Sequence, residues 1–474
     1  MHELVSSEKI ARMSEPTSTL EPPDEVDAAT EDAHALRASS AQNAPIAAVI
    51  LAAGEGRRLG RPSKPLTRVA GVTLLERAVA AARGAGITRV LVVLGHAKEE
   101  VARFVTERGL DVELVENEGF SAGNGSSAAV GGQAAGDRFL LMMCDHLVDV
   151  DALARIVGSD ASFAVAVDTD PVHCDGEEAT KVRLVSGAVV DVGRRLAVWD
   201  AVDAGIFLCD RSVAETAEHA LAAGEGTWNA VKRRWIAQGR RLEAVDIAGS
   251  FWIDVDTPKD VQRAERMLVA RAAHKPHDGV ISRRLNRPLS QRISRVLVRH
   301  EVAPTAITIA TFVLTLVAAG VVALGKFSPA ALIVGGLVVQ AASVVDGCDG
   351  EVARAMLRTS PFGALLDTLL DRFADAVLLT ALAAAAGADT KALVILGGAL
   401  FFSMLVPYVK AAHEAASRTA LPAARVTFGR DARMLAIAAC AIALQPFAAL
   451  VAVAVVSAAE AALRVDRALR AART

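Results

Sequence analysis

Four carboxylates stand in a stretch that is otherwise apolar enough to lie in a membrane. The stretch reads DGCDGEVARAMLRTSPFGALLDTLLD, and its aspartates are Asp346, Asp349, Asp367 and Asp371. The first two are three residues apart and the last two are four apart, so each pair shares one face of its own helix. Because an unpaired acid at bilayer depth costs about 2.5–3.5 kcal/mol on insertion scales, four of them need compensating cations or water. We therefore predict an active site in which two facing helices hold one or two metal ions.

A buried ion-pair network is the competing interpretation of these acids. It would need basic side chains at the same depth, and the sequence offers few of them there. Asp375 extends the acidic stripe by one turn, where helix-end hydration explains it as well as a chemical role does. Arg430 and Arg433 could bind a phosphate of an acceptor, although membrane topology alone would also place arginines at this position.

Small residues recur among the acids at fixed spacing. The motif is Asp346-x2-Asp349-Gly350-x2-Ala353-Arg354-x8-Gly363-x3-Asp367-x3-Asp371. The small residues fall on the helical faces that carry the acids, which leaves room for a flat base or a pyrophosphate to approach the backbone. At every defining position this motif resembles the signature of the CDP-alcohol phosphatidyltransferase family.

That resemblance implies transfer of a phosphoalcohol from a CDP-alcohol to an acceptor hydroxyl, with release of CMP. By the family pattern, Asp346, Asp349 and Asp367 would ligate divalent metals that bridge the pyrophosphate. Asp371 would also lie at the metals and would take the proton of the acceptor hydroxyl. Simple chemistry agrees, because metals neutralise charge on the leaving CMP and a nearby carboxylate can act as a base.

A second candidate site lies near the start of the chain. The run LAAGEGRRL places Gly54 and Gly56 where a strand turns into a loop, and Arg58 and Lys64 follow closely. Backbone amides of such a loop can cradle a triphosphate while the two basic side chains neutralise its charge. The glycine spacing is not that of the dinucleotide fingerprint. The run instead resembles the nucleotidyltransferases that join an NTP to a phosphorylated sugar or alcohol.

The nucleotidyltransferase resemblance extends to further residues. GNGSS, with Gly123, Asn124 and Gly125, stands where that family binds base and ribose. MMCDH puts Asp145 at a strand end as a magnesium ligand, and FWIDVDTP supplies Asp254 and Asp256. Two separated carboxylates suit magnesium held between the α- and β-phosphates.

Two assignments in this domain stay open between a functional and a structural role. Asp256 is equally well explained as a turn-capping acid before Thr257-Pro258. Lys181, in EEATKVR, is predicted to face the substrate phosphate, and the alternative is an exposed strand lysine.

Hydrophobic patterning divides the chain in two. Strand-like runs alternate with helical ones up to about Ala270, and we expect strands at 46–51, 89–94, 139–143, 163–167, 205–208 and 242–245 with a helix at 74–83. We predict a disordered tail over 1–43 that is not a signal peptide, an α/β nucleotidyltransferase (Rossmann-like) domain over 44–270, a linker with a basic juxtamembrane helix over 271–303, and an all-α transmembrane domain over 304–474.

The last of these domains is predicted to contain six membrane spans. Their ranges are 305–325, 329–353, 361–386, 391–411, 431–445 and 447–464. Arginine and lysine gather in alternate loops, so the positive-inside rule places both termini and both sites in the cytoplasm, with the spans in the cell membrane. The helix over 280–300 interleaves six arginines with apolar residues at helical spacing, which is typical of a membrane surface.

The composition supports the division into an α/β domain and a membrane domain, but it does not identify a substrate. The 474 residues are 53% hydrophobic with a net charge of −3, and a mean hydropathy of +0.36 is high for a purely soluble protein. Five cysteines without metal-ligand spacing indicate a reducing compartment.

The order of motifs resembles one bifunctional family along nearly the whole chain after the tail. EEATKVR, DAVDAGIFLCD, ISRRLNRPLSQRIS and DGCDGEVARA are similar to the bifunctional inositol-1-phosphate cytidylyltransferase and di-myo-inositol phosphate phosphate synthase. The resemblance implies that CTP and inositol-1-phosphate form CDP-inositol, whose phosphoinositol then passes to a second inositol-1-phosphate. It also implies Mg²⁺, with Mn²⁺ as an option at the membrane site, a homodimer, and no nucleic-acid partner.

Two features depart from the family pattern, and one rival reaction stays open. The acidic tail has no clear counterpart, and Pro304-Thr305 stands where related transferases often carry Pro-Asn. The rival is a cytidylyltransferase fused to a phospholipid headgroup transferase for another alcohol phosphate. A choline site needs a cage of aromatic side chains, and the chain has only one tyrosine and 4% aromatic residues. Choline-phosphate is therefore disfavoured as the substrate, but glycerol-phosphate is not excluded. A non-enzymatic CTP-sensing scaffold is disfavoured because both sets of acids are intact.

Overall fold

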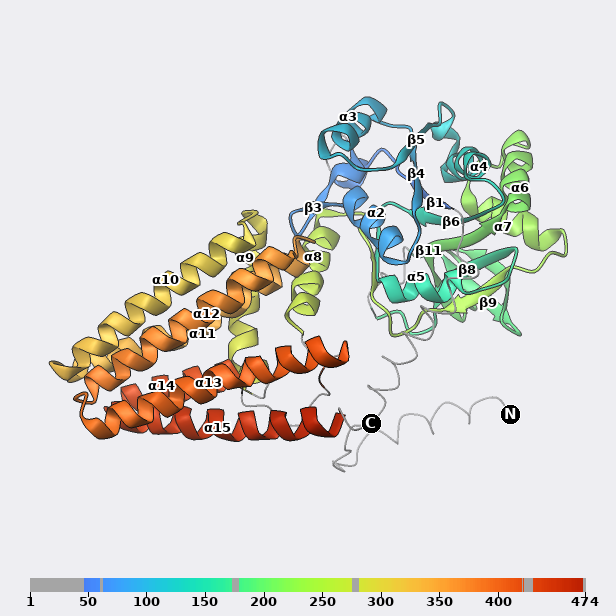
Figure 1. The fold of residues 1–474 in the computed structure, drawn as a ribbon. Coiled ribbons are helices and arrows are strands. Elements are labelled where there is room, and N and C mark those ends of the chain that lie inside the picture. The colour runs from blue at the N-terminus through green and yellow to red at the C-terminus, as the bar shows by residue number, and fades with distance from the viewer. Residues whose placement is uncertain are drawn as a thin grey trace, which may run out of the picture. The chain divides into compact units, whose positions relative to one another are not determined.

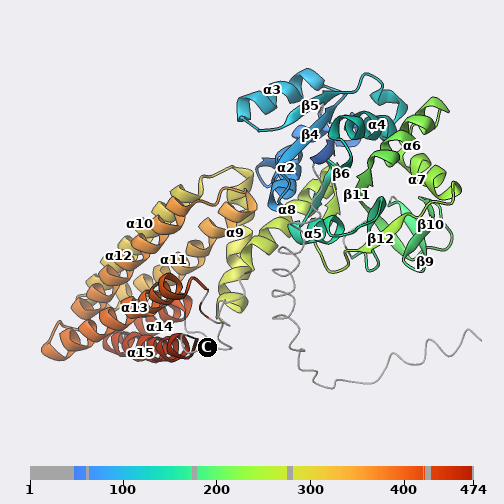
Figure 2. The same ribbon diagram turned by 45° about the vertical axis from the view of Figure 1, so that its right-hand side comes forward.

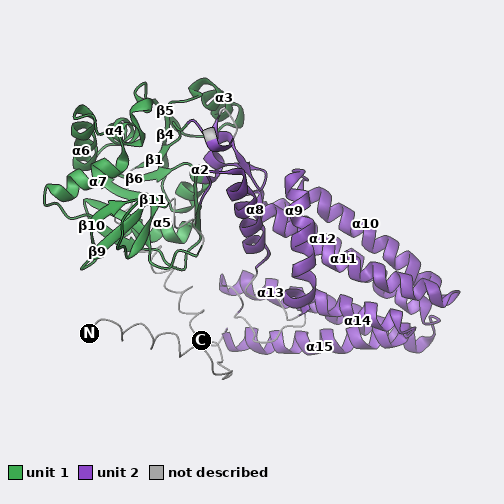
Figure 3. Cartoon of the chain, turned by 180° about the vertical axis from the view of Figure 1, so that it is seen from behind, with its two compact units in different colours: residues 1–54, 78–253 green, residues 55–77, 254–474 purple. Residues whose placement is uncertain are grey.

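The structure is a computed structural model that describes residues 47–59, 63–172, 179–274, 281–419, 421 and 429–471. The tail predicted over 1–43 lies outside the described residues. The chain forms two compact units (Figure 3). The sheet unit contains the residues up to Gly54 and Ala78–Ile253, and the helical unit contains Glu55–Arg77 and Asp254–Thr474. In this division Glu55–Arg77, which lies within the predicted nucleotidyltransferase domain, groups with the helical unit.

A nine-stranded sheet forms the centre of the sheet unit (Figure 1). Its spatial order is β5-β4-β1-β6-β11-β8-β12-β10-β9. The bounds are β1 Ala47–Leu51, β4 Arg89–Leu94, β5 Glu113–Glu116, β6 Arg138–Met143, β8 Phe163–Asp168, β9 Lys181–Val185, β10 Ala188–Gly193, β11 Ala201–Asp210 and β12 Glu243–Asp246. The first four strands in space are parallel, and β11 runs antiparallel to β6 and to β8. A separate two-stranded sheet pairs β7 (His146–Val148) with β13 (Trp252–Asp254).

Helices cover this sheet. They are α2 Leu74–Gly84, α3 Lys98–Arg108, α4 Asn124–Ala135, α5 Val150–Val157, α6 Arg211–Ala222 and α7 Trp228–Ala237. Helices α4, α6 and α7 contact one another, and α5 packs on β8 and β11. One apolar core joins β1, β4, β6, β8 and β11 to α4, α6 and α7, and Phe163 lies at its centre between Trp228 and Trp235.

The strands expected at 89–94, 139–143, 163–167 and 242–245 are confirmed within one residue at each end. Strand β11 is ten residues long rather than the four predicted at 205–208. Its N-terminal half contains Asp203. This charged residue interrupts the apolar pattern, so the sequence predicted only the C-terminal part of the strand. The structure buries that charge beside Lys232 of α7, with side-chain exposures of 4% and 2%.

The Asp203–Lys232 ion pair gives a prediction about stability. Burial lowers the pKa of Lys232, and Asp203 beside it acts against that change. Lys232→Ala leaves Asp203 buried without its cation, so we expect a loss of about 3–5 kcal/mol in the free energy of unfolding of the sheet unit. Arg211→Ala is the control, because it removes an exposed ion pair to Glu215 and should change stability by less than about 0.5 kcal/mol.

Tryptophan fluorescence of the full chain in urea measures this difference. All four tryptophans, Trp199, Trp228, Trp235 and Trp252, lie in the sheet unit, so the signal reports on that unit alone. Equal urea midpoints for Lys232→Ala and Arg211→Ala would contradict the structural role given to the pair.

The helical unit contains eight α-helices among the described residues (Figure 2). They are α8 Pro258–Ala273, α9 Arg287–Arg299, α10 Pro304–Ala323, α11 Pro329–Ala355, α12 Pro361–Ala385, α13 Thr390–Ser417, α14 Arg430–Ile442 and α15 Pro446–Ala471. A π-helical turn, Ser282–Asn286, leads into α9. Helix α11 contacts α8, α9, α10 and α14, and α13 packs along α15. The acids predicted to react lie on α11 and α12.

Apolar packing explains why Glu55–Arg77 belongs to the helical unit. Ala70 and Val72 join a core cluster with Val269 of α8, Val298 of α9 and Val352 of α11. Buried Arg77 adds hydrogen bonds from Nε to Val69 O at 3.1 Å and from Nη2 to Ala355 O at 2.6 Å. Burial lowers the pKa of this guanidinium to about 10.

A helix forms at each of the six predicted spans, but four of the described helices are long and apolar enough to cross a membrane. These are Pro304–Lys326, Pro329–Ala355, Thr390–Ser417 and Pro446–Ala471. Helix α12 carries Asp367, Asp371, Arg372 and Asp375, which breaks its apolar run. Helix α14 has 13 residues, and at 1.5 Å per residue its length is about 20 Å against a hydrocarbon core of about 30 Å. The count of six membrane spans is therefore not confirmed.

Helix α9 is attached to α11 by polar contacts. Glu351 of α11 is fully buried and accepts hydrogen bonds from Arg287 Nη1 at 2.8 Å, Ser290 Oγ at 2.5 Å and Ser294 Oγ at 2.6 Å. Leu285, Leu289 and Val296, which are apolar residues of the predicted juxtamembrane helix, are exposed. The face toward α11 is part polar, because Glu351 needs donors inside the protein, and part apolar, because Val298 packs in one cluster with Val352.

Candidate active sites

The acids of α11 and α12 meet in one small pocket. Asp346, Asp367 and Asp371 each offer a carboxylate oxygen, and the three oxygens lie within 4.8 Å of one another. The pocket walls also include Thr308, Thr311 and Thr315 of α10 together with Arg430 of α14. Thr311 Oγ1 is buried and has no hydrogen-bond partner among the described residues. Three hard oxygen ligands and an unused hydroxyl suit a divalent cation such as Mg²⁺.

Arginines reach these acids, contrary to the expectation that too few basic residues lie at that depth. Arg430 Nη1 lies 2.6 Å from Asp346 Oδ1 and 2.7 Å from Asp371 Oδ1, and Arg430 Nε lies 3.1 Å from Asp375 Oδ1. Arg372 contacts Asp371 at 3.7 Å and Asp375 at 3.3 Å. Arg430, which begins a helix 55 residues beyond Asp375, was predicted only as a possible phosphate-binding residue. Arg372 was not predicted, although it directly follows Asp371.

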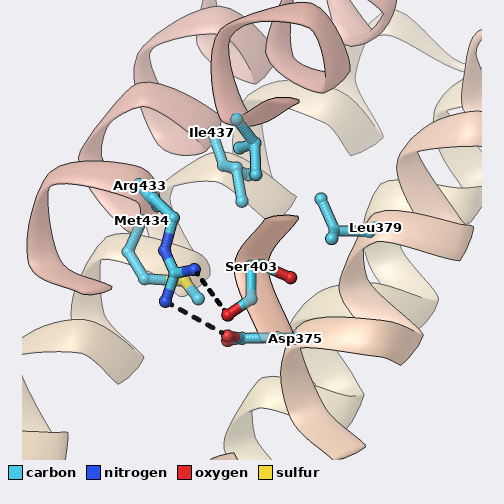
Figure 4. Close-up of a pocket in the computed structure, with 7 residues that line it drawn as sticks. Asp375, Leu379, Ser403, Arg433, Met434 and Ile437 are labelled. Atoms are coloured by element: carbon cyan, nitrogen blue, oxygen red, sulfur yellow. Dashed lines mark hydrogen bonds and ion pairs between the residues drawn. The ribbon is translucent and has the colours of Figure 1, made fainter. Parts of the chain in front are cut away.

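Arg433 is buried in a second small cavity, beside Asp375 and Ser403 (Figure 4). Its guanidinium lies 3.5 Å from Asp375 Oδ2 and 3.5 Å from the carbonyl of Ser403. Leu379, Met434, Ile437 and Val453 line the rest of this small cavity. Of the two predicted phosphate-binding arginines, Arg430 therefore contacts the acids Asp346 and Asp371, whereas Arg433 anchors α14 to α12 and α13.

Asp349 has different hydrogen-bond partners from the other three acids of the motif. Its Oδ2 accepts a hydrogen bond from Thr308 Oγ1 at 2.7 Å, and its Oδ1 accepts one from Gly350 N. Thr308 follows the Pro304-Thr305 pair by three residues and was not singled out from the sequence.

The small residues of the motif have neighbours inside the protein. A Cβ on Gly350 would come within 3.1 Å of Arg354 Nη1, so the glycine leaves room for that guanidinium. Arg354 Nε donates to Ala272 O at 2.7 Å. Gly363 N donates to Ser360 Oγ, the N-cap of α12, and Ala353 is half-buried on α11. These contacts are structural, and besides them Gly350 N donates to Asp349 of the motif.

The glycine-rich loop brings its predicted basic residues to one acid. Lys64 Nζ hydrogen-bonds to Asp256 Oδ1, and Arg58 Nη1 lies 3.8 Å from Asp256 Oδ2. Gly56 has a φ of +64°, and a Cβ there would come within 2.8 Å of Lys64 Cβ. Gly54 is exposed with open space around its Cα. The turn after Asp256 is capped by Thr257 and Asp260, so Asp256 is not needed as the capping acid.

The GNGSS segment is fixed by contacts within the sheet unit. Gly125 N donates to Gly226 O at 2.9 Å, and Asn124 Oδ1 accepts from Trp228 N at 2.9 Å at the start of α7. A Cβ on Gly123 or Gly125 would come within 2.7 Å of Gly226 O. Close approach of two backbones therefore explains both glycines without a ligand.

Lys181 opens β9, where its Nζ lies 5.7 Å from the centre of the Trp199 ring. A cation over an aromatic face is a structural contact that the local sequence does not indicate.

Asp145 follows β6 at the carboxyl end of the parallel strands, as predicted. His146 follows it and begins β7, and its Nε2 lies 3.8 Å from Asp145 Oδ1. Asp254 is the last residue of β13, the strand that pairs with β7. His146 was not among the predicted site residues, although MMCDH places it beside the predicted ligand Asp145.

Comparison with known families gives a class for each of the two domains. Residues 48–241 match the family model described as MobA-like NTP transferase domain, and residues 301–463 match that described as CDP-alcohol phosphatidyltransferase. The α/β sheet with its glycine-rich loop and the helical bundle with its acid pocket thus define a nucleotidyltransferase joined to a CDP-alcohol phosphatidyltransferase.

Curated relatives match most of the chain. A bifunctional IPC transferase and DIPP synthase from Rubrobacter xylanophilus is 42% identical over 426 residues, which cover 88% of this chain and 95% of the relative. One of the same name from Thermococcus kodakarensis is 35% identical over 72% of this chain and 76% of its own. A solved structure of the inositol-1-phosphate CTP transferase from T. maritima is 23% identical with a TM-score of 0.43, covering 46% of this chain and 91% of that one. The chain belongs to the family of bifunctional IPC transferases and DIPP synthases.

Proposed function

We propose that this chain catalyses two consecutive transfers. In the first, a phosphate oxygen of inositol-1-phosphate attacks the α-phosphorus of CTP, which gives CDP-inositol and diphosphate. In the second, a hydroxyl of another inositol-1-phosphate attacks the inositol-bearing phosphorus of CDP-inositol, and CMP leaves. The curated relatives that match both domains at 34–42% identity support this pair of reactions.

Cytidylyl transfer takes place in the nucleotidyltransferase domain. Lys64 and Arg58 neutralise the phosphates, the backbone of Gly54 and Gly56 approaches them, and Gly123, Asn124 and Gly125 lie along the cytidine. Lys181 binds the phosphate of inositol-1-phosphate. Asp145, Asp254 and Asp256 are the carboxylates for Mg²⁺, which would supply charge neutralisation at the attacked phosphate. No protein nucleophile is needed, because the attacking phosphate is already an anion.

The acid pocket carries the second transfer. Asp346, Asp349, Asp367 and Asp371 would hold a divalent cation, Mg²⁺ with Mn²⁺ as an alternative, which would supply charge neutralisation for the leaving CMP. Asp371 takes the proton of the attacking hydroxyl. Gly350, Ala353, Arg354 and Gly363 face the CDP group, and Arg430 favours an acceptor that carries a phosphate. Arg433, the second arginine predicted for that role, supports α14 from its buried position beside Asp375. The pocket formed by Asp346, Asp367, Asp371 and Thr311 is the observation that carries this assignment.

The proposal also covers the membrane topology of the enzyme and its oligomeric state. We place six spans in the cell membrane with both active sites facing the cytoplasm, and we expect a homodimer. The exposed Leu285, Leu289 and Val296 of the predicted juxtamembrane helix would lie at the membrane surface.

Acceptor choice tests the second reaction. Full-length protein in detergent receives radiolabelled CDP-inositol with inositol-1-phosphate, glycerol-phosphate or phospholipid vesicles, and CMP release is measured. Release that depends on inositol-1-phosphate is expected. Release with vesicles alone would instead establish a phospholipid headgroup transferase.

A further inference from the structure

His146 is held on three sides within the sheet unit. Its Nδ1 lies 2.7 Å from the carbonyl oxygen of Ala204. Its ring stacks on that of Trp252 with 6.1 Å between centroids and 13° between planes. A Cβ on Gly205 would come within 2.4 Å of Nδ1, so this position of the ring requires a glycine there. The imidazole therefore has one defined orientation.

The contact to Ala204 fixes which ring nitrogen carries the proton. A carbonyl oxygen only accepts, so Nδ1 donates, and in the neutral imidazole the lone pair is then on Nε2. Nε2 lies 3.8 Å from Asp145 Oδ1. Two ligands of one ion lie no further apart than about 4.2 Å when each bond is about 2.1 Å, so both atoms can bind one ion.

The residues that hold His146 are themselves fixed. Trp252 Nε1 donates to Asp168 Oδ2 at 2.7 Å. Gly205 N donates to Asp203 Oδ1 at 2.8 Å, and the same carboxylate is paired with Lys232. An imidazole that donates its other N–H to a backbone carbonyl is the usual arrangement of a metal-binding histidine. The buried pair Asp203–Lys232 thus fixes the strand segment that orients the ring.

We propose that His146 Nε2 is a ligand, together with Asp145, of the divalent cation used in cytidylyl transfer. This inference rests on the proposed function of the sheet unit. The acid pocket of the helical unit offers three carboxylates, whereas this site offers a nitrogen as well. A nitrogen ligand raises affinity for Mn²⁺ and similar ions relative to Mg²⁺, so the two sites should differ in metal preference.

Electron spin-echo spectroscopy of bound Mn²⁺ tests the assignment without measuring activity. The full-length chain carries Asp346→Asn and Asp367→Asn, which weaken the membrane-domain site, and is loaded with one Mn²⁺ and CTP. Direct coupling to ¹⁴N is expected. His146→Asn in this background should lose the coupling and weaken Mn²⁺ binding about 10-fold or more. His219→Asn, at an exposed histidine of α6, is the matched control and should change neither.

Gly205→Ala provides a second variant that keeps the histidine. Its Cβ would displace the ring, so we expect weaker ¹⁴N coupling and weaker Mn²⁺ binding. Bound Mn²⁺ without ¹⁴N coupling, coupling that survives in His146→Asn, or no Mn²⁺ binding would each overturn the inference. CDP-inositol formation by the otherwise unsubstituted chain distinguishes failure of this ligand assignment from failure of the proposed function. Turnover without nitrogen coupling contradicts the ligand assignment but not the proposed function.

Discussion

Asp367→Asn should stop the enzyme at CDP-inositol. The substitution removes one of the three carboxylates that meet between α11 and α12 while keeping the size of the side chain. A metal contributes several kcal/mol of transition-state stabilisation, so transfer to the second inositol-1-phosphate should fall by about 100- to 1,000-fold. Formation of CDP-inositol from CTP should continue at the wild-type rate, because the carboxylates proposed for that step lie elsewhere.

Asp389→Asn is the control for this experiment. Asp389 accepts a hydrogen bond from Ala392 N at the start of α13, and asparagine caps a helix equally well. CMP release and CDP-inositol accumulation are measured in the same reactions. CMP release by Asp367→Asn at the wild-type rate would show that Asp367 has no role in the second transfer. Equal losses in the rates of both steps would indicate misfolding.

Lys64→Ala should show the opposite pattern. Lys64 hydrogen-bonds to Asp256 and follows the glycine-rich loop, where we place the triphosphate of CTP. Losing a positioned charge at a developing phosphate charge costs about 2.7–4 kcal/mol, so CDP-inositol formation should fall by about 100- to 1,000-fold. CMP release from supplied CDP-inositol should stay at the wild-type rate.

Lys98→Ala is the control for this experiment. It distinguishes the effect of losing a lysine at the site from the effect of losing one positive charge anywhere on the protein. Lys98 pairs with Glu116 on the surface, and each of these side chains is more than one-third exposed. The two variants have the same net charge, and initial rates at saturating CTP compare them. Equal rates of CDP-inositol formation would contradict the role of Lys64.

The sequence predicted the parts of the fold that have a strong local pattern. The apolar run before Gly54, the strand at 89–94 and the helices at the six hydrophobic stretches are present because period and composition specify them locally. The β9–β10 hairpin was missed, although Ser186 and Gly187 have the positive φ values of a tight hairpin turn. A Ser-Gly pair between two alternating segments was the available signal.

Contacts between distant residues could not be predicted in the same way. Arg430 lies beside Asp346 and Asp371 because α14 packs on α11, and no spacing in the sequence indicates that packing. The hydrogen bonds from α9 to Glu351 are a similar case, because Glu351 becomes a buried acceptor only where α9 packs on α11. The acids themselves were predictable, since i, i+3 and i, i+4 spacing places each pair on one face of its helix.

Phosphorus NMR of the full-length protein tests the central claim most directly. The protein in detergent receives magnesium, CTP and inositol-1-phosphate, and signals are followed with time. We predict that CDP-inositol appears first, and that a phosphodiester carrying a terminal phosphate then grows as CMP is released. CTP that remains unconsumed, or CDP-inositol that accumulates without a phosphodiester in the wild-type protein, would contradict the account of one chain with two consecutive transfers.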